Sequence, residues 1–159
     1  MSSTNRLATY AKRLSKYPKW VLSWAVGRAV PLVGTAGIHF EKLTENEVVL
    51  HLKNRRKTGN HIGQIHAAAM ILLAETATGM VVGMNVPDDR LPLIKSIKSD
   101  FVRRSQGAMR AVATLTPEQQ EMIRNTPKGE LYVPVTVTDE SGEQPIVCEM
   151  LWAWIPKKK

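Results

Sequence analysis

The most apolar stretch of this chain contains one ionisable residue, which is the first candidate for chemistry. Residues 67 to 84 are rich in Ala, Leu, Val and Met, contain no proline, and carry Glu75 near their middle. An ionisable side chain in such surroundings costs free energy, and such residues tend to mark functional sites. A carboxylate there could act as a general base on water or as a nucleophile. We therefore take Glu75 as the candidate catalytic residue, against the alternative of a structural group satisfied by hydrogen bonds.

Two further polar residues, Asn60 and His66, come before this stretch. Asn60 lies six residues before His66, and His66 lies nine residues before Glu75. Asn60 can donate and accept hydrogen bonds, so it could orient a water molecule or a carbonyl group, or simply suit a turn. His66 could join the chemistry or only cap a helix. The free N–H groups at the start of such a helix, around Ala67, are positioned donors for a negatively charged oxygen.

The element that carries Glu75 is expected to be a helix buried on most sides, because it is apolar nearly all round. A membrane span is the alternative, but Glu75 and the Thr and Gly interruptions near the middle make a span costly, and no comparable segment follows. Strand-like patterns precede and follow this helix, and Thr116 is expected to cap a short helix to about Arg124. The expected strands cover residues 36–43, 47–52, 94–103, 108–115, 131–139 and 146–155.

The stretch from Asn60 to Glu75 resembles a motif of one enzyme family. It reads NHIGQIHAA and continues with LAE, which is similar to hotdog-fold acyl-CoA thioesterases related to phenylacetyl-CoA and 4-hydroxybenzoyl-CoA thioesterases. In that motif an Asn precedes a His and two small residues at the helix start, and an acidic residue follows two turns later. Asn60, His66 and Glu75 match these positions. The resemblance implies an α+β hotdog fold, a long central helix wrapped by a curved antiparallel sheet, here with an extra N-terminal helix.

The same resemblance implies hydrolysis of an acyl-CoA or acyl-carrier thioester without a cofactor. The implied catalytic residues are Glu75, Asn60 and His66, and the implied substrate-binding residues are Gly63, Ala67 and Ala68. The small pair after the His is usually Gly-Gly and is Ala67-Ala68 here, and the acid is often Asp in this branch. These departures indicate an uncharacterised branch. They keep open a second function, a dimeric protein that binds acyl thioesters without hydrolysing them.

The spacing of His66 and Glu75 also bears on quaternary structure. Nine residues on a helix correspond to about 900° of rotation and about 14 Å of rise, so the two side chains lie on opposite faces. Two such helices packed antiparallel across a twofold axis would bring the N-terminus of one near Glu75 of the other. We therefore expect a homodimer with sites shared between subunits, and a further pairing of dimers stays open.

The positive charge of the chain is concentrated at its two ends. The net charge is +8, residues 1 to 40 contain six basic and no acidic residues, and the last three residues are Lys. The segment between is close to neutral, so a nucleic-acid partner is not expected. The N-terminus, with Tyr17, Trp20 and Trp24, could lie on an anionic membrane surface. We favour the alternative, a helix interrupted near Pro18 and ended near Pro31 that packs its Trp and Leu faces on the domain.

A chain of 159 residues suits a single core. We expect an N-terminal helical extension over residues 1–33, which contributes little to the chemistry, and a hotdog domain over residues 34–159. The one cysteine, Cys148, is expected to be a small buried hydrophobe, and a protein with no secretory pattern and one cysteine suits the cytoplasm. His61 and His66 have no carboxylate or thiol to complete a metal site, so none is expected. Basic residues between 53 and 57 could meet the phosphates of coenzyme A.

Overall fold

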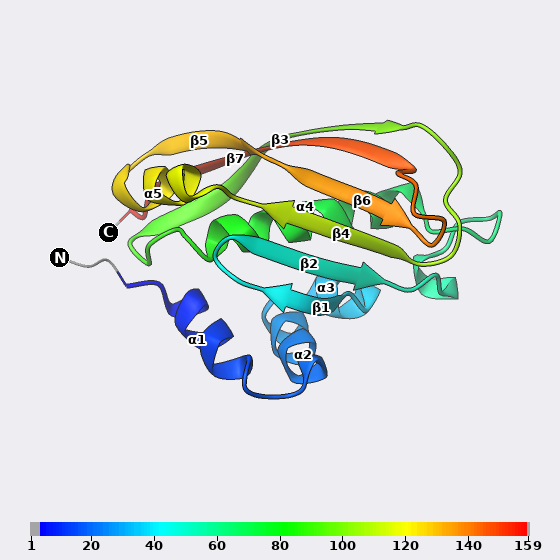
Figure 1. Cartoon of the computed structure of the whole chain (residues 1–159), viewed down its shortest axis with the longest axis horizontal. Helices are drawn as coiled ribbons and strands as arrows, with labels where there is room; N and C mark the ends of the chain where they lie inside the picture. The colour runs from blue at the N-terminus through cyan, green and yellow to red at the C-terminus, as the bar shows by residue number, and fades with distance from the viewer. Residues whose placement is uncertain (1–3, 159) are drawn as a thin grey trace.

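A computed structural model describes residues 4–158 of the chain. In it a long helix lies against a curved antiparallel sheet, and three shorter helices gather beside one edge of that sheet (Figure 1). The helices are α1 (Arg6–Leu14), α2 (Lys19–Ala29), α3 (Pro31–Ala36), α4 (Ala67–Gly83) and α5 (Pro117–Asn125). The strands are β1 (His39–Leu43), β2 (Glu47–Leu52), β3 (Arg90–Phe101), β4 (Met109–Thr114), β5 (Gly129–Val133), β6 (Val135–Asp139) and β7 (Ile146–Pro156).

The strands form one curved layer with β1 and β3 at its outer edges. Strands β1, β2, β4 and β6 are hydrogen-bonded in that order, and β7 lies between β3 and β5, all antiparallel. Strand β6 packs beside β7 and follows β5 directly, which joins the two groups. The residue between β5 and β6 is Pro134, which lacks an N–H and cannot continue a ladder. The single strand expected over 131–139 is therefore wrong in detail, since Pro134 divides it.

Other strand boundaries differ from the expected ones for local reasons. The strand expected from residue 36 begins at His39, because Ala36 still belongs to α3. The strand expected from residue 94 begins at Arg90, so β3 runs to 12 residues and pairs along its whole length with β7. Helix α5 begins as expected, with the Thr116 hydroxyl accepting the Gln119 N–H.

Helix α4 confirms the buried helix expected over residues 67–84. Its sheet-facing side chains, such as Leu73, Ala77 and Val81, have no exposed surface. Trp152 of β7 crosses this helix, and its indole N–H donates to the Thr78 hydroxyl at 2.9 Å. A Cβ atom at Gly79 would come within 2.7 Å of the Trp152 ring, so glycine at this position permits the close approach of the strand.

The N-terminal region contains three helices instead of one interrupted helix. Helix α1 ends at Leu14, and the chain turns through Pro18 before α2 begins. Helix α2 ends at Ala29, close to Pro31 as expected, and Pro31 is the first residue of a further short helix, α3. Proline is well suited to that position because the first N–H groups of a helix have no partner within the helix.

Helix α2 packs only one of its two apolar faces on the domain. Leu22 and Val26 are buried, as expected of the Leu face. Trp20 and Trp24 lie on the other face and are 67% and 64% exposed. The expectation that the Trp face also packs on the domain is therefore wrong.

Two side chains of the N-terminal region bind the domain through its main chain. The Asn5 carboxamide donates to the carbonyl oxygens of Gly83 and Val86, at 2.9 and 2.8 Å, and its oxygen caps α1. The Ser23 hydroxyl of α2 accepts the main-chain N–H of Phe40 in β1 at 2.9 Å. The boundary proposed near residue 33 remains a prediction, although residues before it contribute to the core.

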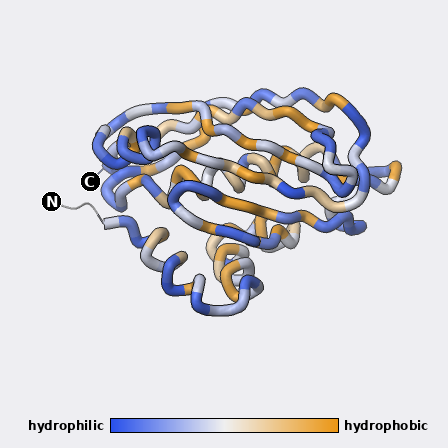
Figure 2. Tube along the Cα trace, in the orientation of Figure 1, coloured by the Kyte–Doolittle hydropathy of each residue, from blue (hydrophilic) through white to orange (hydrophobic). Residues whose placement is uncertain are grey.

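Hydrophobic segments alternate with hydrophilic ones along the strands, and the turns between them are hydrophilic (Figure 2). This is the alternation expected of a sheet with one face against a helix. Among residues 4–158, no helix has both the length and the apolar character needed to cross a membrane.

Candidate functional site

The loop before α4 positions Asn60 through hydrogen bonds within the loop itself. The Asn60 side-chain oxygen accepts the N–H groups of Ile62 and Gln64, at 3.1 and 3.0 Å. Gly63 turns the loop with a φ of 77°, a left-handed conformation that glycine adopts freely. With its oxygen occupied, the half-buried Asn60 keeps its NH2 group, which donates to no other group among residues 4–158. Asn60 can therefore serve as a donor at the start of α4.

His66 caps α4 with its side chain. The Nδ1 atom of its imidazole accepts the Ala68 N–H at 3.0 Å. The main-chain N–H of His66 donates to the Thr58 carbonyl oxygen at 2.8 Å. An imidazole that accepts at Nδ1 carries its proton on Nε2 when neutral. The Ala69 N–H already binds the His66 carbonyl oxygen. Within the described residues this leaves the Ala67 N–H as the donor without a partner at this helix end.

Glu75 lies on the stripe of α4 that the sheet does not cover. Ala68 and Leu72 share this stripe, since they lie about two turns and one turn before Glu75 along the helix. Burial raises the pKa of the Glu75 carboxyl above its usual range, and the neighbouring Thr76 hydroxyl opposes this more weakly. The Thr76 hydroxyl is itself buried and has no well-formed hydrogen bond within residues 4–158. The structure thus places a half-buried carboxyl group at an apolar surface.

One chain does not bring all the expected site residues together. Asn60 and Gly63 lie in the loop before α4, His66, Ala67 and Ala68 lie at its first turn, and Glu75 lies further along the helix. Ala67 and Glu75 are eight residues apart, which corresponds to about 12 Å of rise. A single thioester carbonyl group cannot contact both within one chain.

The outer edge of β3 offers a surface for a second chain. Strand β3 pairs with β7 on one side only, which leaves the main-chain groups of its other side free for another strand. Ile97 and Phe101 pair with the buried residues Met150 and Ile146, so they point toward the α4 side of the sheet. They are nevertheless 41% and 49% exposed. Periodicity alone did not reveal this surface, because an edge strand is recognised only once strand order is known.

The loop of basic residues between 53 and 57, here called the basic loop, lies beside the N-terminal region. The Lys57 ammonium and Arg55 guanidinium groups reach toward Gly37. Burial lowers the pKa of His39 below its usual range, with further lowering by the charges of Lys53 and Arg55. The positive charge expected between residues 53 and 57 is thus gathered in space and could meet a phosphate group.

The remaining candidates for chemistry, Cys148 and a metal site, find no support in the structure of residues 4–158. Burial raises the pKa of the Cys148 thiol, which receives a hydrogen bond from the Ser99 hydroxyl at 3.6 Å, so the reactive thiolate is disfavoured. Among residues 4–158 no group of three His, Cys, Asp or Glu side chains could hold a metal ion.

Residues 18–155 match a sequence family described as a domain of unknown function, DUF4442. The chain belongs to this family. No protein of curated function matches the DUF4442 chain, but solved structures do. A Pseudomonas aeruginosa protein described as a probable thioesterase has 24% identity and a TM-score of 0.76, over 89% of this chain and 97% of that one.

Two further solved structures have a similar fold. A thioesterase from Haemophilus influenzae has 15% identity and a TM-score of 0.67, over 88% of this chain and 92% of that one. A thioesterase family protein from Silicibacter pomeroyi has 14% identity and a TM-score of 0.64, over 85% of this chain and 96% of that one. The hotdog prediction for this DUF4442 protein is confirmed.

Proposed function

We propose that this DUF4442 protein hydrolyses an acyl thioester at a site shared by two subunits. The observation that carries the proposal is Glu75, a half-buried carboxyl group with a raised pKa on the uncovered stripe of α4. Burial at an apolar surface makes a carboxylate a stronger base, which suits general-base chemistry. The names of the similar solved structures support the same class of reaction.

The shared site follows from the distance between the groups. Two subunits that pair through β3 would extend one sheet across the dimer, as exposed edge strands do. If the two α4 helices then lie antiparallel, Glu75 of one subunit approaches the α4 N-terminus of the other. Ile97 and Phe101 would become covered in such a dimer.

Each group has a distinct part in the proposed reaction. The thioester carbonyl oxygen accepts hydrogen bonds from the Ala67 N–H and the Asn60 NH2 group, and the positive end of α4 stabilises the negative charge that develops there. Glu75 of the partner subunit takes a proton from water, whose oxygen attacks the carbonyl carbon. When the tetrahedral intermediate collapses, the C–S bond breaks and the thiolate recovers the proton from Glu75.

Direct attack by Glu75 is a second route to the same products. The carboxylate would form a mixed anhydride with the acyl group as the C–S bond breaks and a thiolate leaves, and water would then cleave the anhydride, regenerating Glu75 and supplying the proton that the thiolate takes up from solvent. His66 orders the start of α4 through its cap in either route. The basic loop, including Arg55 and Lys57, would contact the phosphates of coenzyme A or of a carrier-protein arm.

One observation favours a binding protein as the second candidate. His66 occupies the Ala68 N–H, so one donor that could have met the carbonyl oxygen is already used. A dimer with this arrangement would bind acyl thioesters and hydrolyse them slowly. Measuring both binding and hydrolysis across a chain-length series of acyl-CoAs separates the two functions.

The decisive experiment compares wild type with Glu75→Gln on the best substrate of that series. The amide keeps the shape of the side chain but cannot accept a proton, so we expect kcat to fall by about 10² or more. Glu121→Gln is the matched control, because Glu121 is exposed on α5. Full activity in Glu75→Gln would exclude a catalytic role and leave the binding protein.

Subunit mixing tests whether the site is shared. Glu75→Gln and Asn60→Ala would each inactivate every site in their own homodimers. A mixed dimer would contain one site with both residues intact, so mixing should restore activity. Inactive mixtures of subunits shown to have exchanged would contradict the shared site.

A further inference from the structure

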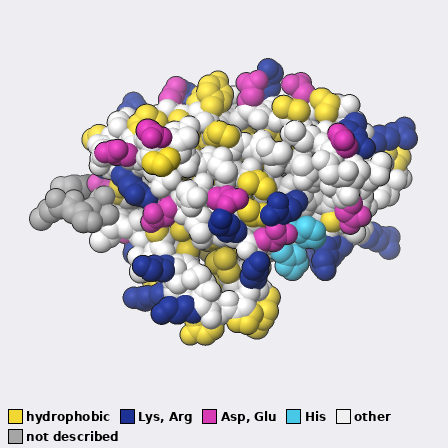
Figure 3. All heavy atoms as spheres, viewed as in Figure 1, with side chains coloured by type: hydrophobic (Ala, Val, Ile, Leu, Met, Phe, Trp, Pro, Cys, Tyr) yellow, Lys and Arg dark blue, Asp and Glu magenta, His cyan; other side chains and the backbone are white. Residues whose placement is uncertain are grey.

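The turn between α1 and α2 forms an aromatic surface at one end of the molecule. Tyr17, Trp20 and Trp24 are 61%, 67% and 64% exposed, and Tyr10 on α1 is 58% exposed. In Figure 3 hydrophobic side chains gather at this end, with Lys and Arg side chains beside them. We call this region the N-terminal tip, defined by Tyr17, Trp20, Trp24 and the basic residues named below.

The exposure of the two Trp side chains follows from the orientation of α2. They are four residues apart and share one face of the helix, whereas Leu22 and Val26 anchor the opposite face in the core. A groove of about 360 Å3 between α2, α3 and β1 runs beside the Trp pair. Large aromatic side chains gathered on a surface in this way mark an interaction site.

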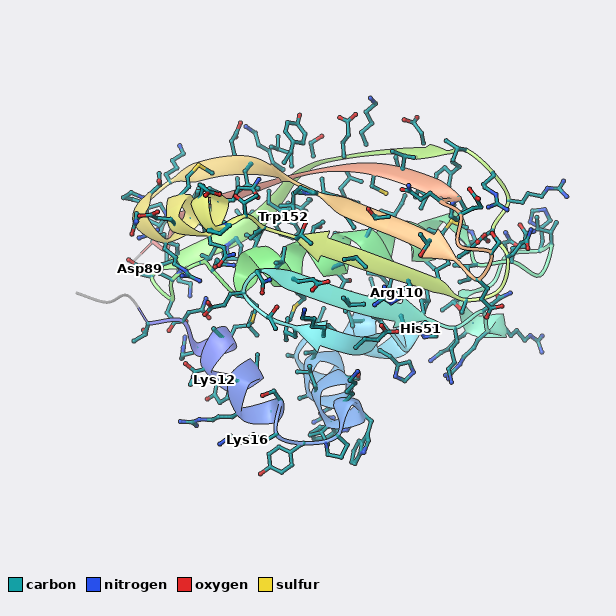
Figure 4. All side chains as sticks on the ribbon, in the orientation of Figure 1. Lys12, Lys16, His51, Asp89, Arg110 and Trp152 are labelled. Carbon is teal, nitrogen blue, oxygen red and sulfur yellow. The ribbon has the colours of Figure 1, made fainter. Side chains whose placement is uncertain are left out.

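Within the part of the chain that the structure describes, the basic residues of the tip form no ion pair with a carboxylate. Lys12, Arg13, Lys16, Lys19 and Arg28 are all exposed, and none of them takes part in an ion pair among residues 4–158. Figure 4 shows Lys12 and Lys16 on the α1 side of the tip. No Asp or Glu occurs between residues 1 and 40. The tip is therefore aromatic and positively charged at once.

We propose that the N-terminal tip binds the surface of an anionic lipid bilayer. Trp and Tyr rings favour the headgroup region, where an apolar ring and a polar edge are both satisfied. Lys and Arg side chains around them are attracted to anionic headgroups. Charge complementarity favours this partner over a second copy of the chain, whose tip would carry the same charge. The tip lies beside β1, whereas the free sheet edge is β3, so this binding is separate from the proposed dimer.

The test measures binding of the full chain to vesicles by sedimentation. The probes are vesicles of phosphatidylcholine alone and of phosphatidylcholine with about one third phosphatidylglycerol. We expect binding to the anionic vesicles to be at least ten-fold stronger, and to weaken as salt screens the charges. The fluorescence of the protein should shift to the blue on binding. Trp152 and Trp154 are already buried, so this shift reports Trp20 and Trp24.

Two pairs of variants separate the tip from the rest of the surface. Trp20→Ser with Trp24→Ser should lose at least ten-fold in vesicle binding and the blue shift, while Met122→Ser with Tyr132→Ser removes exposed apolar side chains elsewhere and should bind normally. Lys12→Glu with Lys16→Glu should also lose at least ten-fold. Arg104→Glu with Lys128→Glu changes the net charge equally at exposed positions elsewhere and should bind normally.

Thermal melts of the tip variants should match wild type, because the changed side chains are exposed. The proposal is overturned if neutral and anionic vesicles bind equally, or if the control pairs lose as much binding as the tip pairs. It is also overturned if the protein binds double-stranded DNA more tightly than anionic vesicles and shows no blue shift with the vesicles. That result would indicate that the positive charge of the tip binds a nucleic acid and not a lipid surface.

Discussion

The exposed side chains of β3 set the free energy that the proposed dimer gains from apolar burial. Ile97 and Phe101 retain 41% and 49% of their surface exposed on the α4 side of the sheet. Full burial of such a side chain contributes about 1.5–3 kcal/mol, so covering the exposed part contributes about 1 kcal/mol per side chain. A twofold dimer holds four of these side chains, which together contribute about 4 kcal/mol. Replacing both by Ser should therefore raise the dimer Kd by about 10³.

The dimer Kd is measured by analytical ultracentrifugation over a range of protein concentrations. Met122→Ser with Tyr132→Ser is the control pair, because these exposed side chains lie on α5 and β5 and not on the free edge strand β3. Thioesterase activity should fall in parallel with the fraction of dimer in Ile97→Ser with Phe101→Ser, while the thermal melt of the isolated subunit stays close to that of wild type.

Two results would refute this reasoning. A wild-type protein that is monomeric and hydrolyses thioesters would show that one chain completes the site. A double variant that dimerises as tightly as wild type would show that β3 is not the contact.

Three further predictions concern stability. Burial raises the pKa of Glu75, so the folded state holds the proton of this carboxyl more tightly than the unfolded state does. The resulting contribution to the free energy of unfolding is complete below the ordinary pKa of 4.5 and is lost as pH rises through the raised pKa. Glu75→Gln should thus be more stable than wild type at neutral pH, and denaturant titrations should show the difference vanishing in acid; a constant difference would contradict the assigned cause. Gly79→Ala places a Cβ within 2.7 Å of Trp152 and should lower stability by about 1–3 kcal/mol in thermal unfolding, whereas an unchanged melt would mean that the ring moves freely. Asn5→Ala removes the cap of α1 and two hydrogen bonds to main-chain carbonyls at and after the end of α4, so it should lower stability by about 1–2 kcal/mol and speed hydrogen exchange there; unchanged exchange would argue against a stabilising role for these two hydrogen bonds.

The central helix was predictable because its signal is local. Residues 67 to 84 are apolar all round and free of proline, and the structure buries them as α4 from Ala67 to Gly83. The position of Glu75 on the uncovered stripe was not predictable in the same way. It depends on which side of α4 the sheet approaches, and Trp152 at Gly79 fixes that side from the other end of the chain.

The N-terminal helices show where sequence patterns are ambiguous. Trp20 and Trp24 mark one apolar face of α2, and Leu22 and Val26 mark another. Periodicity identifies both faces but not the one that packs, since that choice depends on the shape of the domain beneath. The capping role of His66 is a similar case. Its place before the apolar stretch indicated a cap, but only the three-dimensional structure shows that its Nδ1 atom accepts the Ala68 N–H.

The hydrogen bond between Ser23 and the Phe40 N–H has a consequence for how many copies can assemble. It occupies a main-chain donor on the outer side of β1, and α2 covers that strand. A sheet with two free edges can add copies at both ends and grow into a filament, as open-ended assemblies do. If two copies pair through β3 as proposed, each uses the free edge of the other, and the covered β1 edge offers no further site for strand addition. In such a dimer, α2 would keep the extended sheet from growing past two copies at the β1 edges.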